Sequence, residues 1–262
     1  MNIEMIFSVI FGILTIMVKA ETVPTVSFGD PAKPHIVFLI SEDENNYEAH
    51  LTIPPFAKQL EKEYGLKATV ILGKGERTGF KYPGLHKIKN ADLLVVFSRR
   101  VALKSDQMNM IKEYLEAGKP LVGIRTANHA FSVREEIKDG YIDWKEFVPE
   151  ILGCENRGYG PVGPGTDVEV NVEQDNHAII QRYKTREWHS DGNVYLVAPL
   201  LDPNIKVLLE GTSDGKQEPI AWTRKTKNNG KVFYTSLGHP SDFKKPEFIT
   251  LLINGINWAI NE

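Results

Sequence analysis

The stretch LVGIRTANHAF, residues 121–131, indicates a buried strand that runs into a sharp turn. Its first four residues are apolar or glycine, and polar side chains follow at once: Arg125, Thr126, Asn128 and His129. Many α/β enzymes place a nucleophile at such a turn, but this stretch contains no cysteine and no serine. The stretch therefore predicts an α/β fold and leaves open what chemistry its turn supports.

Similar apolar runs precede this stretch at residues 35–41, 67–73 and 91–98. They show no polar alternation, which indicates strands that are covered on both faces. Apolar residues at helical spacing, followed by glycine, indicate helices between the strands at residues 52–65 and 107–118. Alternating strands and helices predict right-handed crossovers, and hence a flavodoxin-like α/β sandwich with a mainly parallel central sheet and helices on both faces.

The pattern changes after Phe131. Residues 134–166 are polar and rich in glycine and proline, which indicates a long excursion over the carboxyl end of the sheet. Residues 167–173 alternate as a half-exposed strand does, and the turn at residues 228–230, Asn-Asn-Gly, indicates a hairpin. Closing strands are expected at residues 206–213, 219–226 and 231–239, and a final helix at 247–261. With no evident linker or repeat, residues 35–262 are predicted to form one domain.

The N-terminal segment has the pattern of an export signal. An apolar run, Met5 to Val18, is followed by Ala20 before Glu21, which resembles a cleavage site with small residues. The run is shorter than the ~20 residues that cross a bilayer, although an uncleaved anchor remains the alternative. We expect a signal peptide at residues 1–20, a linker at 21–34, and export to the periplasm or the cell exterior without stable membrane insertion after cleavage.

Composition and charge limit the class of partner. The chain is 42% hydrophobic and 25% charged, which is typical of a globular protein. Its net charge of −3 predicts no basic surface, so nucleic acid is not an expected partner. Cys154 is the only cysteine, so no internal disulfide can form, and its apolar neighbours predict a buried filler.

Polar side chains follow the predicted strands at the edge where open α/β sheets bind ligands. They are Glu42, Asp43 and Tyr47 after the first strand, Arg99 and Arg100 after the third, Arg125, Asn128 and His129 after the fourth, and His239 and Asp242 after the last. His189 lies in a segment that can reach the same edge. This convergence predicts a small-molecule site, although Arg99 and Arg100 are equally suited to capping strand-end carbonyls.

The seven histidines divide into two groups. Four lie at the ends of predicted elements without polar company and are expected to be structural: His35, His50, His86 and His177. The others, His129, His189 and His239, follow strands or lie beside tryptophan or aspartate. Since histidine exchanges protons near neutral pH, these three are the candidates for acid–base chemistry.

Several segments together resemble the trehalose-utilisation (ThuA-like) family. They are DLLVVFSRR (92–100), YLEAGKPLVGIRTANHAF (114–131), EWH (187–189), IAWTRK (220–225) and KVFYTSLGHPSDF (231–243). The resemblance extends over residues 35–262. It implies a fold similar to class I glutamine amidotransferases and a role in carbohydrate metabolism, in a family often found beside sugar oxidoreductases.

The same resemblance argues against glutaminase activity. In the amidotransferases the turn reads G-x-C-x-G, its cysteine attacks the amide, and a downstream His-Pro-Glu supplies the base. Here Arg125 occupies the nucleophile position, His239 and Pro240 are kept, and Ser241 replaces the carboxylate. Because a guanidinium cannot form a thioester, neither the chain nor an Arg125→Cys variant is expected to release ammonia from glutamine.

The candidate residues suit a neutral polyol or a keto-sugar. We expect Arg125 and Asn128 to hold hydroxyls or stabilise charge on a carbonyl oxygen, and His239 and His189 to act as base and acid with His129 nearby. Trp222 or Tyr47 is expected to stack on the sugar, and Arg99 and Asp242 to bind it. The leading hypothesis is an exported enzyme that acts on a sugar derivative by isomerisation, elimination or hydrolysis.

Two alternatives stay open. The first is a carbohydrate-binding protein without turnover. The second is a metal-dependent sugar hydrolase in which His129, His189 and His239, with Glu42 or Asp242, hold a divalent metal, although no familiar metal-binding spacing supports it. No cofactor motif is evident, and the sequence does not decide the oligomeric state.

The sequence also predicts how two site residues affect stability. Arg125 and His239 follow apolar runs that we expect to be neighbouring strands, so their side chains should share one pocket. Both lie in turns, and replacing either by alanine is expected to change stability by under ~1 kcal/mol.

Overall fold

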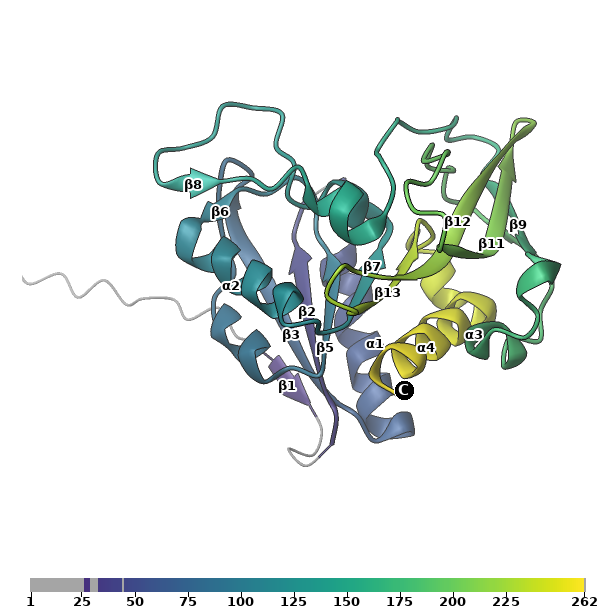
Figure 1. Ribbon diagram of the computed structural model, residues 1–262, viewed down its shortest axis with the longest axis horizontal. Coiled ribbons are helices and arrows are strands. Elements are labelled where there is room, and N and C mark those ends of the chain that lie inside the picture. The colour runs from purple at the N-terminus through teal and green to yellow at the C-terminus, as the bar shows by residue number, and fades with distance from the viewer. Residues whose placement is uncertain (1–25, 29–32, 44, 262) are drawn as a thin grey trace, which may run out of the picture.

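The computed structural model describes residues 26–28, 33–43 and 45–261 (Figure 1). At its centre, five strands lie side by side in the order β13-β7-β5-β2-β3, and all neighbouring pairs among them are parallel. The strands are β2 (His35–Ser41), β3 (Lys67–Glu76), β5 (Leu93–Phe97), β7 (Leu121–Ile124) and β13 (Lys231–Thr235). Their carboxyl ends therefore meet at one edge.

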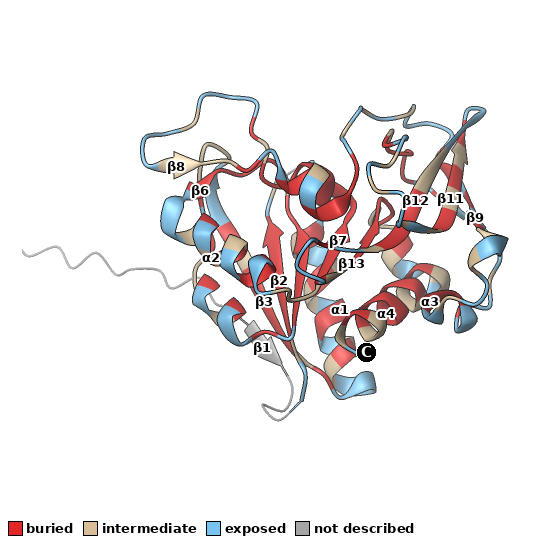
Figure 2. Ribbon diagram, viewed as in Figure 1, coloured by how far each residue is buried: buried red, intermediate tan, exposed pale blue. Residues whose placement is uncertain are grey.

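Helices cover both faces of this parallel core, as the sequence predicts. On one face lie α1 (Ala49–Tyr64) and α4 (Pro246–Ile260), and on the other lies α2 (Ser105–Glu116) (Figures 1 and 2). Successive residues of β2 alternate between the two layers: Phe38 packs in the cluster of α1 and α4, and Leu39 in the cluster of α2. Because both faces are buried, the strand has no polar alternation.

An antiparallel extension continues the sheet beyond β13. It consists of β9 (Thr166–Val170), β10 (Glu187–Ser190), β11 (Lys206–Ser213) and β12 (Lys216–Lys225). The expectation of a mainly parallel sheet is therefore correct for the five-stranded core only. The reason is local: β11 and β12 are joined by the two-residue turn Asp214–Gly215, both with positive φ, and so short a turn reverses the chain.

Two sequence predictions in this extension are confirmed. Residues 228–230 join β12 to β13 as an antiparallel pair, which is the predicted hairpin. Along β9, buried and exposed residues alternate, as expected for a half-exposed strand, although the strand ends at Val170 and the rest of the predicted stretch 167–173 leads into a 3-10 turn. The hairpin is what returns the chain to the parallel core beside β7.

Short elements complete the described chain. They are β1 (Val26–Phe28), β4 (Gly79–Lys81), β6 (Leu103–Lys104), β8 (Tyr141–Ile142), α3 (Ala178–Gln181), the 3-10 turns at Leu85–Asn90, Arg125–His129, Val172–Gln174 and Asp242–Lys244, and a π-helical turn at Phe147–Leu152. The excursion after Phe131 passes through β8 and the π-helical turn, and it covers the α2 face of the sheet with Phe147 and Leu152.

Cys154 and the N-terminal segment complete the comparison with the sequence. Cys154 is buried and free, and burial raises the pKa of its thiol to about 12, in keeping with a packing role. The predicted signal peptide lies outside the described residues and stays a prediction. Within the stretch 21–34, β1 pairs with β3 in antiparallel fashion. Among the helices of the described residues, none has both the length and the apolar character needed to cross a membrane.

Candidate functional site

The turn after β7 has the sharp geometry that the sequence indicates. Arg125 begins a 3-10 turn with a φ of 45°, a left-handed conformation that is rare for residues other than glycine. Gly123 lies so close to Tyr234 that a Cβ atom would come within 2.9 Å of its ring. All five residues of the turn are buried. The turn is thus a packed structural element, and its polar side chains point inward.

Arg125 is held beneath the surface by hydrogen bonds and ring contacts. Its Nη1 donates to the carbonyl oxygen of Ser236 over 2.7 Å, and its Nη2 donates to Asn193 Oδ1 over 2.8 Å. The guanidinium carbon lies 3.9 Å from the ring centre of Tyr47 and 4.9 Å from that of Tyr195. With 1% of its surface exposed, Arg125 cannot touch a substrate, so the expectation that it binds one is wrong.

The loop after β13 is fixed by a buried carboxylate. Asp242 accepts hydrogen bonds from the backbone N–H groups of Gly238 and His239, each over 2.9 Å, and from the hydroxyl of Ser190 over 2.8 Å. Asp242 is fully buried. The prediction that Asp242 binds a substrate is therefore wrong, because its carboxylate accepts hydrogen bonds that anchor the loop carrying His239.

His239 is the titratable side chain that this loop presents. Its Nδ1 lies 2.8 Å from the hydroxyl oxygen of Ser241. A hydrogen bond from Ser241, together with the charge of Lys245, holds the pKa of Asp191 below its ordinary value. Asp191, Ser241 and His239 thus form a chain of contacts. Burial and the positive charge of Arg125 lower the pKa of His239, so its ring is neutral at pH 7.

His239 lines a cavity of about 430 Å³, within the size range of ligand pockets, which we call the histidine cavity. Its walls combine aromatic rings, amides, one arginine and one carboxylate, and its lining residues include Tyr47, Glu48, Arg99, His129, Tyr159, Asn193, Tyr195 and His239. The rings of Tyr47 and His239 are 6.3 Å apart in an edge-on arrangement. The predictions for Tyr47, Arg99 and His239 therefore converge on one cavity at the carboxyl edge of the sheet.

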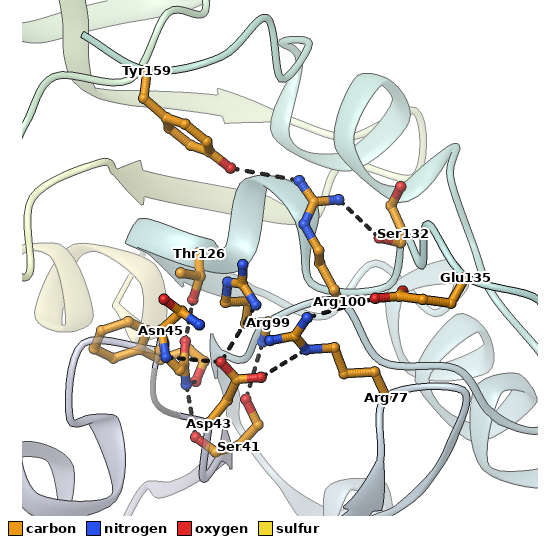
Figure 3. A network of polar contacts seen from close by, with 12 residues as sticks. Ser41, Asp43, Asn45, Arg77, Arg99, Arg100, Thr126, Ser132, Glu135 and Tyr159 are labelled. Atoms are coloured by element: carbon orange, nitrogen blue, oxygen red, sulfur yellow. Dashed lines mark hydrogen bonds and ion pairs between the residues drawn. The ribbon is translucent and has the colours of Figure 1, made fainter. Parts of the chain in front are cut away.

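Arg99 and Arg100 are adjacent in sequence but point to different places (Figure 3). Arg99 Nη1 lies 3.3 Å from Asp43 Oδ1, and Arg77 Nε lies 2.7 Å from Asp43 Oδ2. Arg100 extends away from this group, and its Nη1 donates to the carbonyl oxygen of Ser132 over 3.1 Å. Arg99 faces the histidine cavity, whereas Arg100 caps a backbone carbonyl and faces a second cavity.

The second cavity, which we call the arginine cavity, measures about 590 Å³. Arg100, Asn128, His129, Arg134, Lys145 and Arg157 are among its lining residues. His129 lines both cavities and is 2% exposed. Its Nδ1 contacts Asn128 Oδ1 and lies 3.0 Å from Asn156 Nδ2. Burial and the nearby arginines keep the pKa of His129 well below its ordinary value, so the wall between the cavities is neutral.

Two predicted residues lie elsewhere. Trp222 is fully buried, and its Nε1 donates to the carbonyl oxygen of Leu152 over 2.8 Å, so its predicted stacking on a sugar is wrong. His189 lies on β10, where its Nδ1 is 2.7 Å from Asp167 Oδ1 and its side chain is 48% exposed. Among the described residues that line the histidine cavity, His189 is absent. The structure offers no support for His189 as the partner acid of His239.

The candidate metal ligands do not gather. His129 is enclosed in the wall, His189 pairs with Asp167, and His239 contacts Ser241. Over the described part of the chain, no group of three or more histidine, cysteine, aspartate or glutamate side chains is arranged to hold a metal ion. The proposed ligand set, with Glu42 or Asp242, therefore does not fit a metal site.

Sequence reasoning missed the residues that follow β10. Asp191, Asn193 and Tyr195 lie within HSDGNVY, directly beyond His189, which drew attention instead. Asn193 and Tyr195 line the histidine cavity, and Asp191 reaches Ser241. An available signal was the alternation of these three residues, which places every second side chain on one side of an extended segment.

Comparisons with known proteins agree on the fold. A family model described as trehalose utilisation (ThuA) matches residues 37–259. A ThuA-like protein from Bacteroides uniformis ATCC 8492 is similar, with a TM-score of 0.61 and 20% identity, over 88% of this chain and 95% of that chain. A ThuA-like protein from Parabacteroides merdae ATCC 43184 gives a TM-score of 0.63 and 17% identity, over 87% of this chain and 91% of that chain.

A more distant likeness involves a carbohydrate deacetylase, with a TM-score of 0.52 and 16% identity, over 85% of this chain and 33% of that chain. No curated protein matches the chain. At these levels of identity, the likeness to solved structures concerns the fold alone.

Proposed function

This chain belongs to the trehalose-utilisation (ThuA) family, and we propose that it acts on a sugar or keto-sugar derivative by proton transfer at His239. Membership of this family indicates a carbohydrate-related function. The histidine cavity supports the finer proposal, because it offers a neutral histidine among aromatic and amide groups. Arg125, Trp222 and Asp242 support the protein around this cavity and do not contact the substrate.

The observation that carries the proposal is the position of His239, which lines the histidine cavity and contacts Ser241 through Nδ1. A carboxylate can only accept hydrogen bonds, so the hydroxyl proton of Ser241 is directed to Asp191. The Ser241 oxygen lies 2.8 Å from Nδ1 of His239, and the Ser241 N–H donates to the same Nδ1 over 3.3 Å. These contacts position the ring, and the neutral tautomer with its proton on Nδ1 carries a lone pair on Nε2, as a general base requires.

The walls of the cavity suit a sugar. Tyr47 offers an aromatic ring for stacking, and Tyr159, which is 40% exposed, offers a hydroxyl that pairs with sugar hydroxyls. Arg99 supplies a cation that can stabilise negative charge developing on a carbonyl oxygen. These groups replace Arg125 and Asn128 in the roles that the sequence suggested.

The proposed step is proton abstraction next to a carbonyl. Nε2 of His239 takes a proton from the carbon beside the carbonyl, and the C–H electron pair moves to form an enediolate whose oxygen faces Arg99. Return of the proton to the other carbon gives an isomer, provided that the hydroxyl proton on the first carbon passes to the former carbonyl oxygen. Loss of a leaving group from the next carbon gives elimination. The same base can instead activate water for hydrolysis.

The test is proton exchange with solvent. The purified protein is incubated in D₂O with disaccharides and their 3-keto derivatives, and proton NMR follows the C–H signals beside the carbonyl. We expect these signals to fade faster with the wild type than with His239→Gln or with no protein. New signals in the same spectra report isomers, elimination products or free monosaccharides.

The alternative of a binding protein without turnover predicts a different result. In that case the sugar signals broaden or shift on binding, while no exchange and no product form. Such a result across the whole panel would replace the proposed enzyme by a carbohydrate-binding protein.

Export of the mature chain is a separate proposal, supported by the apolar run and small-residue site before Glu21. Expression with the native N-terminus, followed by cell fractionation and N-terminal sequencing, is expected to give an exported product that begins near Glu21. A product that keeps Met1 and pellets with the membrane fraction would support a retained anchor.

A further inference from the structure

The arginine cavity lies beside the histidine cavity and differs from it in charge. Arg100, Arg134, Lys145 and Arg157 line it, against a single lining carboxylate, Glu155. Glu155 is already paired with Arg157 over 2.8 Å, and Lys145 lies 3.9 Å from Asp143. Within the described part of the chain, Arg100 and Arg134 form no ion pair with a carboxylate, so the cavity keeps an excess of positive charge.

Unsatisfied donors line the same cavity. Asn128 is fully buried and Arg100 is 5% exposed. Among the described residues, Asn128 Nδ2 and Arg100 Nε have no hydrogen-bond partner. A buried polar group without a partner is costly, and native proteins satisfy most such groups. Both of these donor atoms are enclosed, so a ligand in the cavity meets the cationic groups that line it, and acceptor oxygens are the groups that suit them.

The guanidinium of Arg100 is also held in place before any ligand binds. Its Nη1 donates to Ser132 O over 3.1 Å, and its Nη2 lies 3.5 Å from the Tyr159 hydroxyl (Figure 3). A positioned guanidinium binds the oxygens of carboxylates and phosphates with less loss of side-chain freedom than a flexible cation does. The positive charge of this cavity also acts on His129, in the wall between the two cavities. Besides burial, Arg100 and Arg134 lower the pKa of His129.

We propose that the arginine cavity binds the carboxylate or phosphate of an acidic sugar whose neutral part occupies the histidine cavity. The second half of this statement rests on the proposed function, whereas the anion site does not. The two cavities share His129, and Tyr159 lines the histidine cavity while contacting Arg100. The two cavities are therefore adjacent, as a single ligand that spans both requires.

The experiment compares the binding of charged and neutral sugars to the full chain. Isothermal titration calorimetry is carried out with glucuronate, glucose 6-phosphate, glucose and inorganic phosphate at two salt concentrations. We expect at least one acidic sugar to bind tenfold or more tightly than glucose, with affinity that falls as salt rises. The stronger of the two acidic sugars identifies the anion as a carboxylate or a phosphate.

Variants locate the site. Arg134 is exposed, so Arg134→Gln should fold normally and weaken acidic-sugar binding about tenfold, as expected for one charge-assisted contact. Arg100→Gln should weaken it further, and because Arg100 is buried its folding is checked by circular dichroism. Arg182→Gln removes the same charge at an exposed position that lines a different cavity, and should leave binding unchanged.

The outcomes separate the two proposals. Equal binding of acidic and neutral sugars, or equal losses in Arg134→Gln and Arg182→Gln, would overturn the anion site. His239→Gln should lose exchange while keeping the preference for acidic over neutral sugars. If it keeps both, the proposed function fails and the anion site stands.

Discussion

The turn after β7 and the loop after β13 leave neighbouring parallel strands at the same edge, yet they treat their polar side chains in opposite ways. After β7, Arg125, Asn128 and His129 all fold inward and are nearly inaccessible. After β13, Asp242 is buried and fixes the backbone, while His239 remains in the histidine cavity. The comparison shows that two neighbouring connections at one edge of a sheet can have different roles. The connection after β7 supports the site, and the connection after β13 presents the reactive group.

The largest effect is expected at Arg125, the supporting side of this comparison. Replacing Arg125 by methionine removes the donor to the buried Ser236 carbonyl and the shorter of two hydrogen bonds to Asn193 Oδ1, so we expect a loss of about 3 kcal/mol or more in the free energy of unfolding. The sequence-based expectation of under ~1 kcal/mol assumed an exposed turn, and it is withdrawn here because Arg125 is buried. Urea unfolding followed by tryptophan fluorescence measures the change. Wild-type stability with lost sugar binding would mean that Arg125 is a ligand contact instead.

The next effect concerns the reactive side. His239→Gln should change the free energy of unfolding by under ~1 kcal/mol, because the side chain is partly exposed and Asp242 holds the loop through backbone N–H groups. Loss of a general base should slow solvent exchange by about 10²- to 10⁴-fold. The measurements are urea unfolding and the NMR exchange rate. A variant that unfolds but exchanges at the wild-type rate per folded molecule would make His239 a structural cap.

A smaller effect should come from the residues that orient His239. Ser241→Ala removes the hydroxyl between His239 and Asp191, and we expect a loss of roughly tenfold in exchange rate, below the effect of removing the base itself. Ser241→Thr keeps the hydroxyl and should retain most activity. Asp191→Asn removes a negative charge that raises the pKa of His239, so its acid limb should move to lower pH. Equal rates and identical pH profiles in all three variants would leave Ser241 and Asp191 without a positioning role.

The smallest effect is the shape of the wild-type pH profile. Burial and Arg125 lower the pKa of His239 below 6.5, and the base is active when neutral. Exchange should therefore fall as the pH drops through this lowered pKa, and at pH 6.5 more than half of the plateau rate should remain. Initial rates between pH 4.5 and 8, a range chosen around the ordinary value of about 6.5, check this. An acid limb above pH 6.5 would point to another titrating group.

The parallel half of the fold could be predicted from the sequence because burial on both faces leaves a direct trace. Val37 and Phe38 are both apolar since each meets a different helical layer. The antiparallel half is harder to predict, because the apolar pattern of residues 206–213 indicates a strand but not which strand it pairs with or in which direction. Only the Asp214–Gly215 turn fixes that direction, through positive φ at both residues.

The site was predictable in its location and not in its contacts. Tyr47, Arg99 and His239 follow strands whose ends share an edge, and that rule is enough to bring them together. The fate of Arg125 depends on Asn193 and Ser236, which are 68 and 111 residues away in the chain. No local pattern tells whether a polar side chain after a strand will find such partners or remain in a cavity.

The contact between Tyr47 and Arg125 has a stereochemical consequence. The guanidinium covers one face of the Tyr47 ring at 3.9 Å, so a sugar that stacks on this ring must use the opposite face. A sugar placed there turns one defined side toward His239, whose ring lies edge-on to Tyr47. Deuterium taken from solvent should then enter the substrate with a single configuration at carbon, so a buried cation that never touches the sugar would set the handedness of the product.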